Sequence, residues 1–370
     1  MAGIPIGVQP MWILILALLT WLLGHYYYPE QVSGISAVAA YGLGLLSALL
    51  LFGGIVLHEL GHAVVARRRG VEIEEIDLWL LGGVSRMKGY PHAATDELRY
   101  ALAGPAVSAA LAAAFGVVAL ALPTSTPAAL EALVEYEMFV NAAILVFNLL
   151  PAFPLDGGRA VRALIWRRDG DFPRATGIAA KIGRGFGYAM IALGLLATVA
   201  GAVEGLWFAL IGFFVVSAAG QEERGARVHA AFAGREAGSL MSFPAVTLPA
   251  GLSVADADDA FFAGLRLDSF PVFEDHRYVG LVDRRAIARV PEEERSRTTV
   301  GDIADRDPEL LVDQHQDVAE LLDRPAFQRV GRAVVSTAGD KVGILSITDV
   351  ERALRARDTV GVTKPRPRAA

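Results

Sequence analysis

The sequence contains no cysteine. Disulfide scaffolds, thiolate zinc sites, iron–sulfur clusters and cysteine nucleophiles are therefore excluded, and any metal site must use histidine and carboxylate ligands. Charge is also scarce, because Asp, Glu, Lys and Arg make up only 20% of the 370 residues. The net charge of −6 lacks the basic excess of nucleic-acid-binding proteins, so we expect no nucleic-acid partner.

Hydrophobic residues are abundant, at 54% of the chain with a mean hydropathy of +0.42. A soluble globule has fewer, so the composition predicts a part that lies in the lipid bilayer. More than half of the charged residues lie after position 220. We therefore predict a multi-pass α-helical membrane domain at 1–220, followed by a linker at 221–238 and a soluble C-terminal part.

Apolar stretches of about 20 residues, enough to cross a hydrocarbon core of about 30 Å, recur in the first part. We predict six spans, near 11–28, 35–66, 98–122, 134–166, 185–202 and 205–219. The segments 29–34, 123–133 and 203–204 contain no Lys or Arg, whereas the loops between the other span ends contain many arginines together with Lys88 and Lys181. Because Lys and Arg are retained in the cytoplasm, we expect a cell-membrane protein with both termini and the C-terminal part in the cytoplasm.

The second span ends with His58-Glu59-Leu60-Gly61-His62. On a helix, residues four positions apart lie on one face, so both imidazoles can bind one zinc ion with Glu59 nearby as general base. The alternative is a pair of histidines satisfied by water at a helix end. Ionisable groups at membrane depth are costly and usually functional, which favours the metal site.

A catalytic zinc site needs a third protein ligand and an open position for water. The other histidines lie on the wrong membrane face, in a loop or in the soluble part: His25, His92, His229, His276 and His315. Asp156 is the better candidate, because a carboxylate inside an apolar span needs a partner. Pro151, Pro154 and the Gly157-Gly158 pair predict a break of the fourth span there, which is tolerated only where the backbone is buried in protein or lines a wet cavity. The alternative for Asp156 is a salt bridge with Arg159 or Arg162.

The two motifs together, HELGH in the second span and Asn148-x-x-Pro151-x-x-x-Leu155-Asp156-Gly157 in the fourth, resemble the site-2 protease family of intramembrane zinc metalloproteases. In particular, the chain is similar to the six-span prokaryotic branch with a cytoplasmic regulatory tail. The resemblance implies one zinc ion per chain held by His58, His62 and Asp156, with Glu59 as catalytic base. It also implies a catalytic role for Asn148 in holding the substrate backbone or oxyanion, for which a helix–helix hydrogen bond is the alternative.

Between the second and third spans, 71–80 partly alternates apolar and polar residues and is followed by a Gly82-Gly83 pair. This pattern predicts a small membrane-associated β-hairpin, whose edge could bind an unwound substrate by β-augmentation. An amphipathic hairpin that only lies on the bilayer is the alternative. The small residues of 103–108 predict close helix packing and no chemistry.

The C-terminal part contains an internal repeat, in which 244–254 matches 308–318 and 272–280 matches 335–343. Each unit has two short β runs followed by a helical stretch. The pattern resembles a tandem pair of α/β CBS domains, which we place at 239–291 and 298–358, with a disordered tail at 359–370. Such pairs often bind adenosyl nucleotides and dimerise, which makes a homodimer a candidate assembly.

Ser346-Ile347-Thr348-Asp349 resembles the CBS segment that holds phosphate and ribose, which makes Thr348 and Asp349 candidate nucleotide ligands. The alternative is helix capping alone, since these residues precede a helical stretch.

We therefore predict an intramembrane zinc endopeptidase that cleaves transmembrane protein substrates in the bilayer, regulated through its CBS pair. A CBS-regulated membrane transporter and a catalytically inactive relative that binds membrane proteins are the alternatives.

Overall fold

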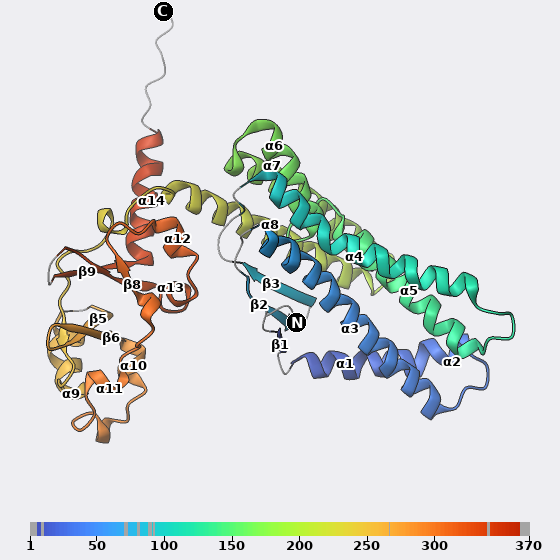
Figure 1. The fold of residues 1–370 in the computed structure, drawn as a ribbon, viewed down its shortest axis with the longest axis horizontal. Helices are drawn as coiled ribbons and strands as arrows, with labels where there is room; N and C mark the ends of the chain where they lie inside the picture. The colour runs from blue at the N-terminus through green and yellow to red at the C-terminus, as the bar shows by residue number, and fades with distance from the viewer. Residues whose placement is uncertain are drawn as a thin grey trace, which may run out of the picture. The chain divides into compact units, whose positions relative to one another are not determined.

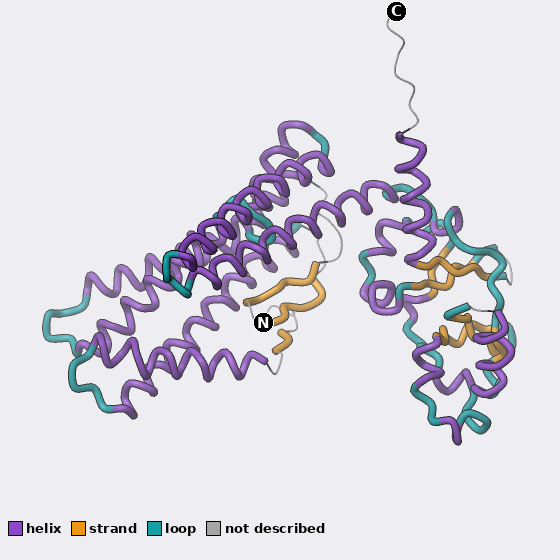
Figure 2. Tube along the Cα trace, turned by 180° about the vertical axis from the view of Figure 1, so that it is seen from behind, coloured by secondary structure: helices purple, strands orange, loops and turns teal. Residues whose placement is uncertain are grey.

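The computed structural model describes residues 6–8, 11–69, 73–79, 82–87, 91, 93–265, 267–338 and 341–362. The chain divides into two compact units, Met1–Ala226 and Arg227–Ala370. Long helices make up most of the described part of the N-terminal unit, beside one small sheet, whereas the C-terminal unit mixes short helices and strands (Figures 1 and 2).

The N-terminal unit is a bundle of long helices. Its first helix runs through α1 (Met11–Leu22), a π-helical turn (Leu23–Tyr27) and α2 (Tyr28–Gln31). The others are α3 (Ala37–Arg68), α4 (Ala94–Ala121), α5 (Ala128–Asn148), α6 (Asp156–Asp169), α7 (Phe172–Val199) and α8 (Gly205–Phe232). The loops after α2 and after α4 lie at the same end of this bundle (Figure 1), as expected for two loops on one side of a membrane.

Five of the described helices are long and apolar enough to cross a membrane: Met11–Gln31, α3, α4, α7 and α8. The predicted fourth span is instead two helices, because the chain leaves the helix after Asn148 and re-enters it at Asp156. Its first half, α5, is as apolar on average as the other long helices, but it differs from the five in carrying three carboxylates close together, Glu131, Glu135 and Glu137. The count of six spans stays a prediction.

Two further boundaries differ from the prediction. Helix α7 begins at Phe172 rather than near 185, because the Asp171 side chain accepts a hydrogen bond from the Arg174 amide, 2.9 Å away, and caps the helix. Helix α8 continues to Phe232 through most of the segment predicted as a linker. A single helix therefore connects the two units.

A three-stranded sheet accompanies the bundle, with the order β1 (Ile6–Val8), β2 (Ile73–Trp79) and β3 (Gly82–Met87). The antiparallel β2–β3 pair agrees with the predicted hairpin. The parallel pairing of β1 with β2 was not predicted, because no local pattern links segments nearly 70 positions apart. One edge of β2 is thus already occupied by the N-terminal segment.

The C-terminal unit contains two sheets with the same strand order. The first consists of β4 (Leu248–Pro249), β5 (Ser269–Glu274) and β6 (Arg277–Asp283); the second consists of β7 (Leu311–Asp313), β8 (Arg332–Ser336) and β9 (Val342–Ser346). The helices are α9 (Val254–Ala257), α10 (Arg284–Ala288), α11 (Val300–Ile303), α12 (Val318–Leu322), α13 (Pro325–Val330) and α14 (Ile347–Val362). In each sheet a parallel pair precedes an antiparallel pair, as the internal repeat predicts.

The two repeats also exchange segments. Ser242, at the start of the first repeat, pairs with Ile344 in β9, and Asp305, before β7, pairs with Leu281 in β6. Leu281 and Val334, one from each repeat, share a buried apolar cluster. The boundaries predicted at 239–291 and 298–358 thus separate segments that complete each other's sheets.

Candidate metal centre

Helix α3 positions the two histidines of the HELGH motif on one face. His58 and His62 lie one turn apart and are 4% and 3% exposed, so the bundle covers both rings. Helix α3 extends past both residues to Arg68, which keeps the motif in regular helix and holds the two rings at the spacing predicted from the sequence.

Asp156 is the first residue of α6 and is 8% exposed. It follows the irregular segment 149–155, which contains Pro151 and Pro154 and interrupts the predicted fourth span, whereas Gly157 and Gly158 lie inside α6. Glycine is needed directly after Asp156, because a Cβ at Gly157 would overlap the main-chain carbonyls of Leu149 and Leu150. The same break that ends α5 therefore turns the Asp156 carboxylate toward α3.

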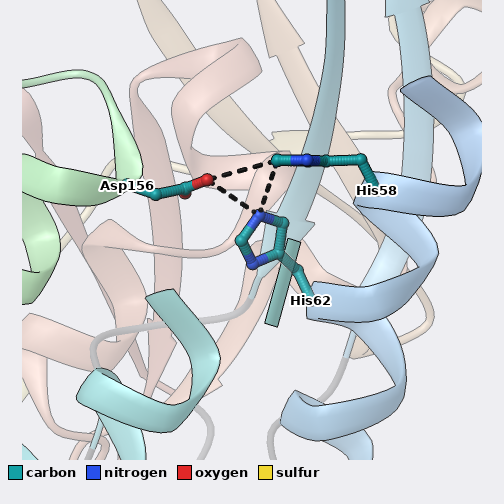
Figure 3. A group of neighbouring side chains, drawn as sticks. All are labelled: His58, His62 and Asp156. Atoms are coloured by element: carbon teal, nitrogen blue, oxygen red, sulfur yellow. Dashed lines mark hydrogen bonds and ion pairs between the residues drawn. The ribbon is translucent and has the colours of Figure 1, made fainter. Parts of the chain in front are cut away.

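The three side chains meet at one point (Figure 3). Asp156 Oδ2 lies 3.2 Å from Nε2 of both His58 and His62, and these two nitrogens are 3.3 Å apart. A tetrahedral zinc site with bonds of about 2.0–2.2 Å places its ligand atoms roughly 3.3 Å from each other. The spacing of the three donor atoms therefore fits a zinc ion, with one position left for water or substrate.

The outer ring nitrogens explain why a cation belongs there. His62 Nδ1 lies 2.8 Å from the main-chain oxygen of Tyr100, which only accepts hydrogen bonds, so Nδ1 carries the proton and Nε2 presents a lone pair. His58 Nδ1 lies 2.9 Å from the hydroxyl of Ser108. The Ser108 hydroxyl can accept a hydrogen bond from Nδ1 of His58, and with that tautomer both Nε2 atoms and the carboxylate offer lone pairs to one shared metal ion.

Two residues of the segment 103–108, predicted from the sequence to serve packing alone, belong to this centre. Ser108 holds His58, and a Cβ on Gly104 would overlap the Nε2 atoms of both histidines. The prediction of no chemistry for this segment was thus incomplete. The close approach of α4 to the histidines requires glycine at this position. The sequence of the segment alone does not predict this contact, because it depends on how two separate helices pack.

Glu59 and Asn148 are the two predicted catalytic residues outside the ligand set. Glu59 is half-buried and close enough to His62 and Tyr100 to interact with both electrostatically. Asn148 is the last residue of α5, and its amide donates to the main-chain oxygen of Ile144, 3.1 Å away. The structure thus gives Asn148 a hydrogen bond within its own helix.

The two arginines considered as partners of Asp156 bond elsewhere. Arg159 donates to the hydroxyl of Tyr100 at 2.7 Å, and Arg162 forms ion pairs with Glu97 and Glu222. The carboxylate of Asp156 is instead directed to the two histidines.

In the C-terminal unit, Thr348 is exposed at the start of α14. Asp349 accepts hydrogen bonds from the Ser346 amide at 3.0 Å and the Ser346 hydroxyl at 2.6 Å, and pairs with Arg352. These contacts are those of the capping alternative. Nucleotide binding by Thr348 and Asp349 stays a prediction.

The chain matches two protein families. Peptidase family M50 matches residues 46–130 and 116–193, which include both motifs, and the CBS domain matches residues 237–293. A solved structure, the site-2 protease from Methanocaldococcus jannaschii, shares 32% identity over 60% of this chain and 93% of its own, with a TM-score of 0.40.

Relatives that align over most of their own length support the assignment of a protein family. Rip3 of Mycobacterium tuberculosis, named as a zinc metalloprotease, is 39% identical over 99% of this chain and 93% of its own length. Zinc metalloprotease MJ0392 of Methanocaldococcus jannaschii is 32% identical over 83% of this chain and 84% of its own length. The chain therefore belongs to peptidase family M50, and it is a membrane-embedded zinc metalloprotease of the site-2 type with a C-terminal CBS region.

Proposed function

We propose that His58, His62 and Asp156 hold the catalytic zinc ion and that Glu59 is the general base for hydrolysis of peptide bonds within or near transmembrane segments. The observation that carries this proposal is the convergence of three buried donor atoms within 3.3 Å of one another. Zinc bound there would lower the pKa of a coordinated water to about 7 and polarise the scissile carbonyl.

The protein residues then have separate tasks. Glu59, directly beside His58 in sequence and half-buried, accepts the proton of the attacking water and passes it to the leaving amine. Ser108 and the Tyr100 carbonyl hold the imidazole rings in orientation. Asn148 can hold the substrate backbone or oxyanion only after exchanging its bond to Ile144, so its role is the less direct one.

The expected substrates are membrane proteins with locally unstable helices. A transmembrane helix hides its amides in i→i−4 hydrogen bonds and must unwind before a carbonyl reaches the metal. The β2–β3 sheet supports the capture of such an extended segment, and since β1 covers one edge of β2, the outer edge of β3 is the one for an added strand. Helix-weakening residues in the substrate therefore favour cleavage.

The remaining assignments concern topology and regulation. The loops 29–34 and 123–133, free of Lys and Arg, support cytoplasmic termini and a cytoplasmic CBS pair. Regulation through this pair, by an adenosyl nucleotide at Thr348 and Asp349 or by homodimerisation, is supported by the repeated sheets. Absence of calorimetric binding of ATP and AMP, together with unchanged cleavage, would reject the nucleotide part.

The central test is Glu59→Gln in the full chain. A general base contributes about 10²–10⁴-fold to the rate, so we expect cleavage of a membrane-helix reporter to fall by that factor while zinc content stays unchanged. In a transporter or an inactive binding protein, this substitution would leave the function unchanged. Cleavage retained at the wild-type rate would reject the role of Glu59.

A further inference from the structure

The proposed zinc ligands lie on two helices, His58 and His62 on α3 and Asp156 on α6. Zinc binding therefore requires α6 to keep a fixed position against α3 and α4. Arg162 lies six positions after Asp156 on α6 and is 3% exposed. A buried guanidinium is costly unless its charge is paired and its hydrogen bonds are made. The contacts of Arg162 therefore show which segments it holds together.

Arg162 is enclosed by two carboxylates and two aromatic rings. Its Nε donates to Glu97 Oε1 at 2.6 Å, with a second, shorter contact from Nη2 to the same atom, and its Nη1 donates to Glu222 Oε1 at 2.5 Å. The guanidinium carbon lies 5.1 Å from the ring centre of Phe153 and 4.9 Å from that of Phe172. Such cation–π contacts strengthen when water is excluded.

Two of these partners lead directly to the metal ligands. Glu97, on α4, precedes by one turn Tyr100, whose carbonyl receives the Nδ1 proton of His62. Phe153 lies in the segment that immediately precedes Asp156. Arg162 thus contacts the segments that support both halves of the centre. Metal ligands need such outer support, because small displacements of a ligand weaken binding markedly.

The third partner, Glu222, connects the metal centre to the helix that leads into the C-terminal unit. Glu222 lies on α8, and this helix continues without interruption to Phe232, which is fully buried in the main apolar core of the second repeat. Ten residues separate Glu222 from Phe232, which is about 15 Å of helix. A shift or rotation of α8 therefore moves Glu222 relative to Arg162.

We propose that Arg162 is a positioning residue for Asp156, and that the Arg162–Glu222 ion pair transmits movements of α8 from the C-terminal unit to the metal centre. The inference rests on the proposed zinc ligands. It also gives a reason for the second carboxylate at Arg162: Glu97 already pairs with this guanidinium, yet Glu222 on α8 pairs with it as well.

The chain offers a matched control for this ion pair. Glu223, the next residue on α8, pairs with Arg184 at 2.6 Å, and Arg184 lies on α7, which carries none of the three proposed ligands. Glu222→Gln and Glu223→Gln each remove one carboxylate from neighbouring positions of one helix. A purely structural role of α8 predicts equal effects for the two variants.

The experiment compares zinc affinity, by chelator competition, and reporter cleavage for the two full-length variants. We expect Glu222→Gln to weaken zinc binding by about 10-fold or more and to lower kcat with little change in KM. Glu223→Gln is expected to stay within about twofold of the wild type. Equal zinc affinities of the two variants would overturn the positioning role.

A second comparison tests transmission along α8. Phe232→Leu loosens the core of the second repeat, and we expect it to change zinc affinity in the wild type but not further in the Glu222→Gln background. Effects that add completely in the double variant would overturn transmission through this ion pair. Failure of the zinc site itself is distinguishable, because then wild-type protein and all variants would bind zinc equally poorly.

Discussion

Asp156 and His58 are 98 positions apart in the chain, yet Asp156 Oδ2 lies 3.2 Å from His58 Nε2. The contact joins the first residue of α6 to the C-terminal third of α3. His62 completes the set at the same distance. The donor atoms thus come from one local motif and one distant carboxylate, and each part can be tested separately.

The first prediction concerns zinc content. We expect the purified full-length protein to hold about one zinc ion and Asp156→Ala to lose it, because two histidines alone make an incomplete site. Asp169→Ala, at the other end of α6, is the control and should keep the metal. Elemental analysis measures both, and equal zinc in the wild type and Asp156→Ala would exclude Asp156 as a ligand.

The second prediction concerns the hydroxyl that holds His58. Ser108→Ala removes the 2.9 Å contact with Nδ1, so the ring loses its orientation. Loss of such a partner typically costs 10–100-fold in metal affinity, and we expect a decrease of about that size. Chelator competition measures the affinity, and the melting temperature of the metal-free protein checks the fold. An unchanged affinity would show that the bundle alone orients His58.

The third prediction concerns the glycine beside the histidines. Gly104→Ala inserts a methyl group where it would overlap both Nε2 atoms, and we expect loss of zinc binding and of cleavage. Gly116→Ala is the control on the same helix, since its Cβ would be 3.4 Å from Met138 Sδ, an ordinary contact. The measurement is the zinc content of the two variants. A Gly104→Ala protein with full zinc content would contradict the close approach of α4 to the two histidines.

The fourth prediction concerns a buried carboxyl outside the metal centre. Glu137 is fully buried near the midpoint of α5, and among the described residues neither of its carboxylate oxygens has a hydrogen-bond partner. Because an unpaired charge at this depth is costly, Glu137→Gln is expected to stabilise the protein by about 1 kcal/mol or more.

The matched control is Glu135→Gln, at an exposed position of the same helix, with an expected effect within about 0.5 kcal/mol. Thermal unfolding of the full chain in one detergent compares the two variants. Destabilisation by Glu137→Gln would instead indicate that the native protein supplies a donor or cation to this carboxylate.

The fifth prediction concerns pH and the two repeats. Although burial acts in the opposite direction, the hydrogen bond from Arg329 holds the pKa of Asp305 below its usual value. A carboxyl with a lowered folded-state pKa stabilises the fold above its unfolded pKa, and this contribution is lost as the pH falls below about 4. Because the pair is partly exposed, its contribution is at most about 1 kcal/mol.

Arg329→Gln is therefore expected to speed amide hydrogen exchange in β6 at neutral pH, with the difference from the wild type vanishing in acid. Arg355→Gln, from a strongly exposed pair on α14, is the control with little effect. Exchange in the full chain at several pH values measures this. A difference that does not decrease as the pH falls below about 4 would contradict the electrostatic origin.

Several features of this protein are determined by local sequence. The four-residue spacing of His58 and His62 places them on one helix face, and Pro151 and Pro154 interrupt the helix before Asp156, because both effects depend only on backbone geometry. The repeated β runs of the C-terminal part likewise appear as two sheets of equal order. Periodicity and turn residues are sufficient for these predictions.

Other features were decided only by tertiary structure. The sequence does not indicate that Ser108 meets His58, that Gly104 leaves room for both rings, or that Arg162 pairs with Glu97 and Glu222, since these contacts depend on how separate helices approach. The continuation of α8 into the C-terminal unit also escaped prediction, because its composition turns polar while its helix persists. Local patterns specify elements, whereas the distances between elements, on which metal binding depends, come from packing.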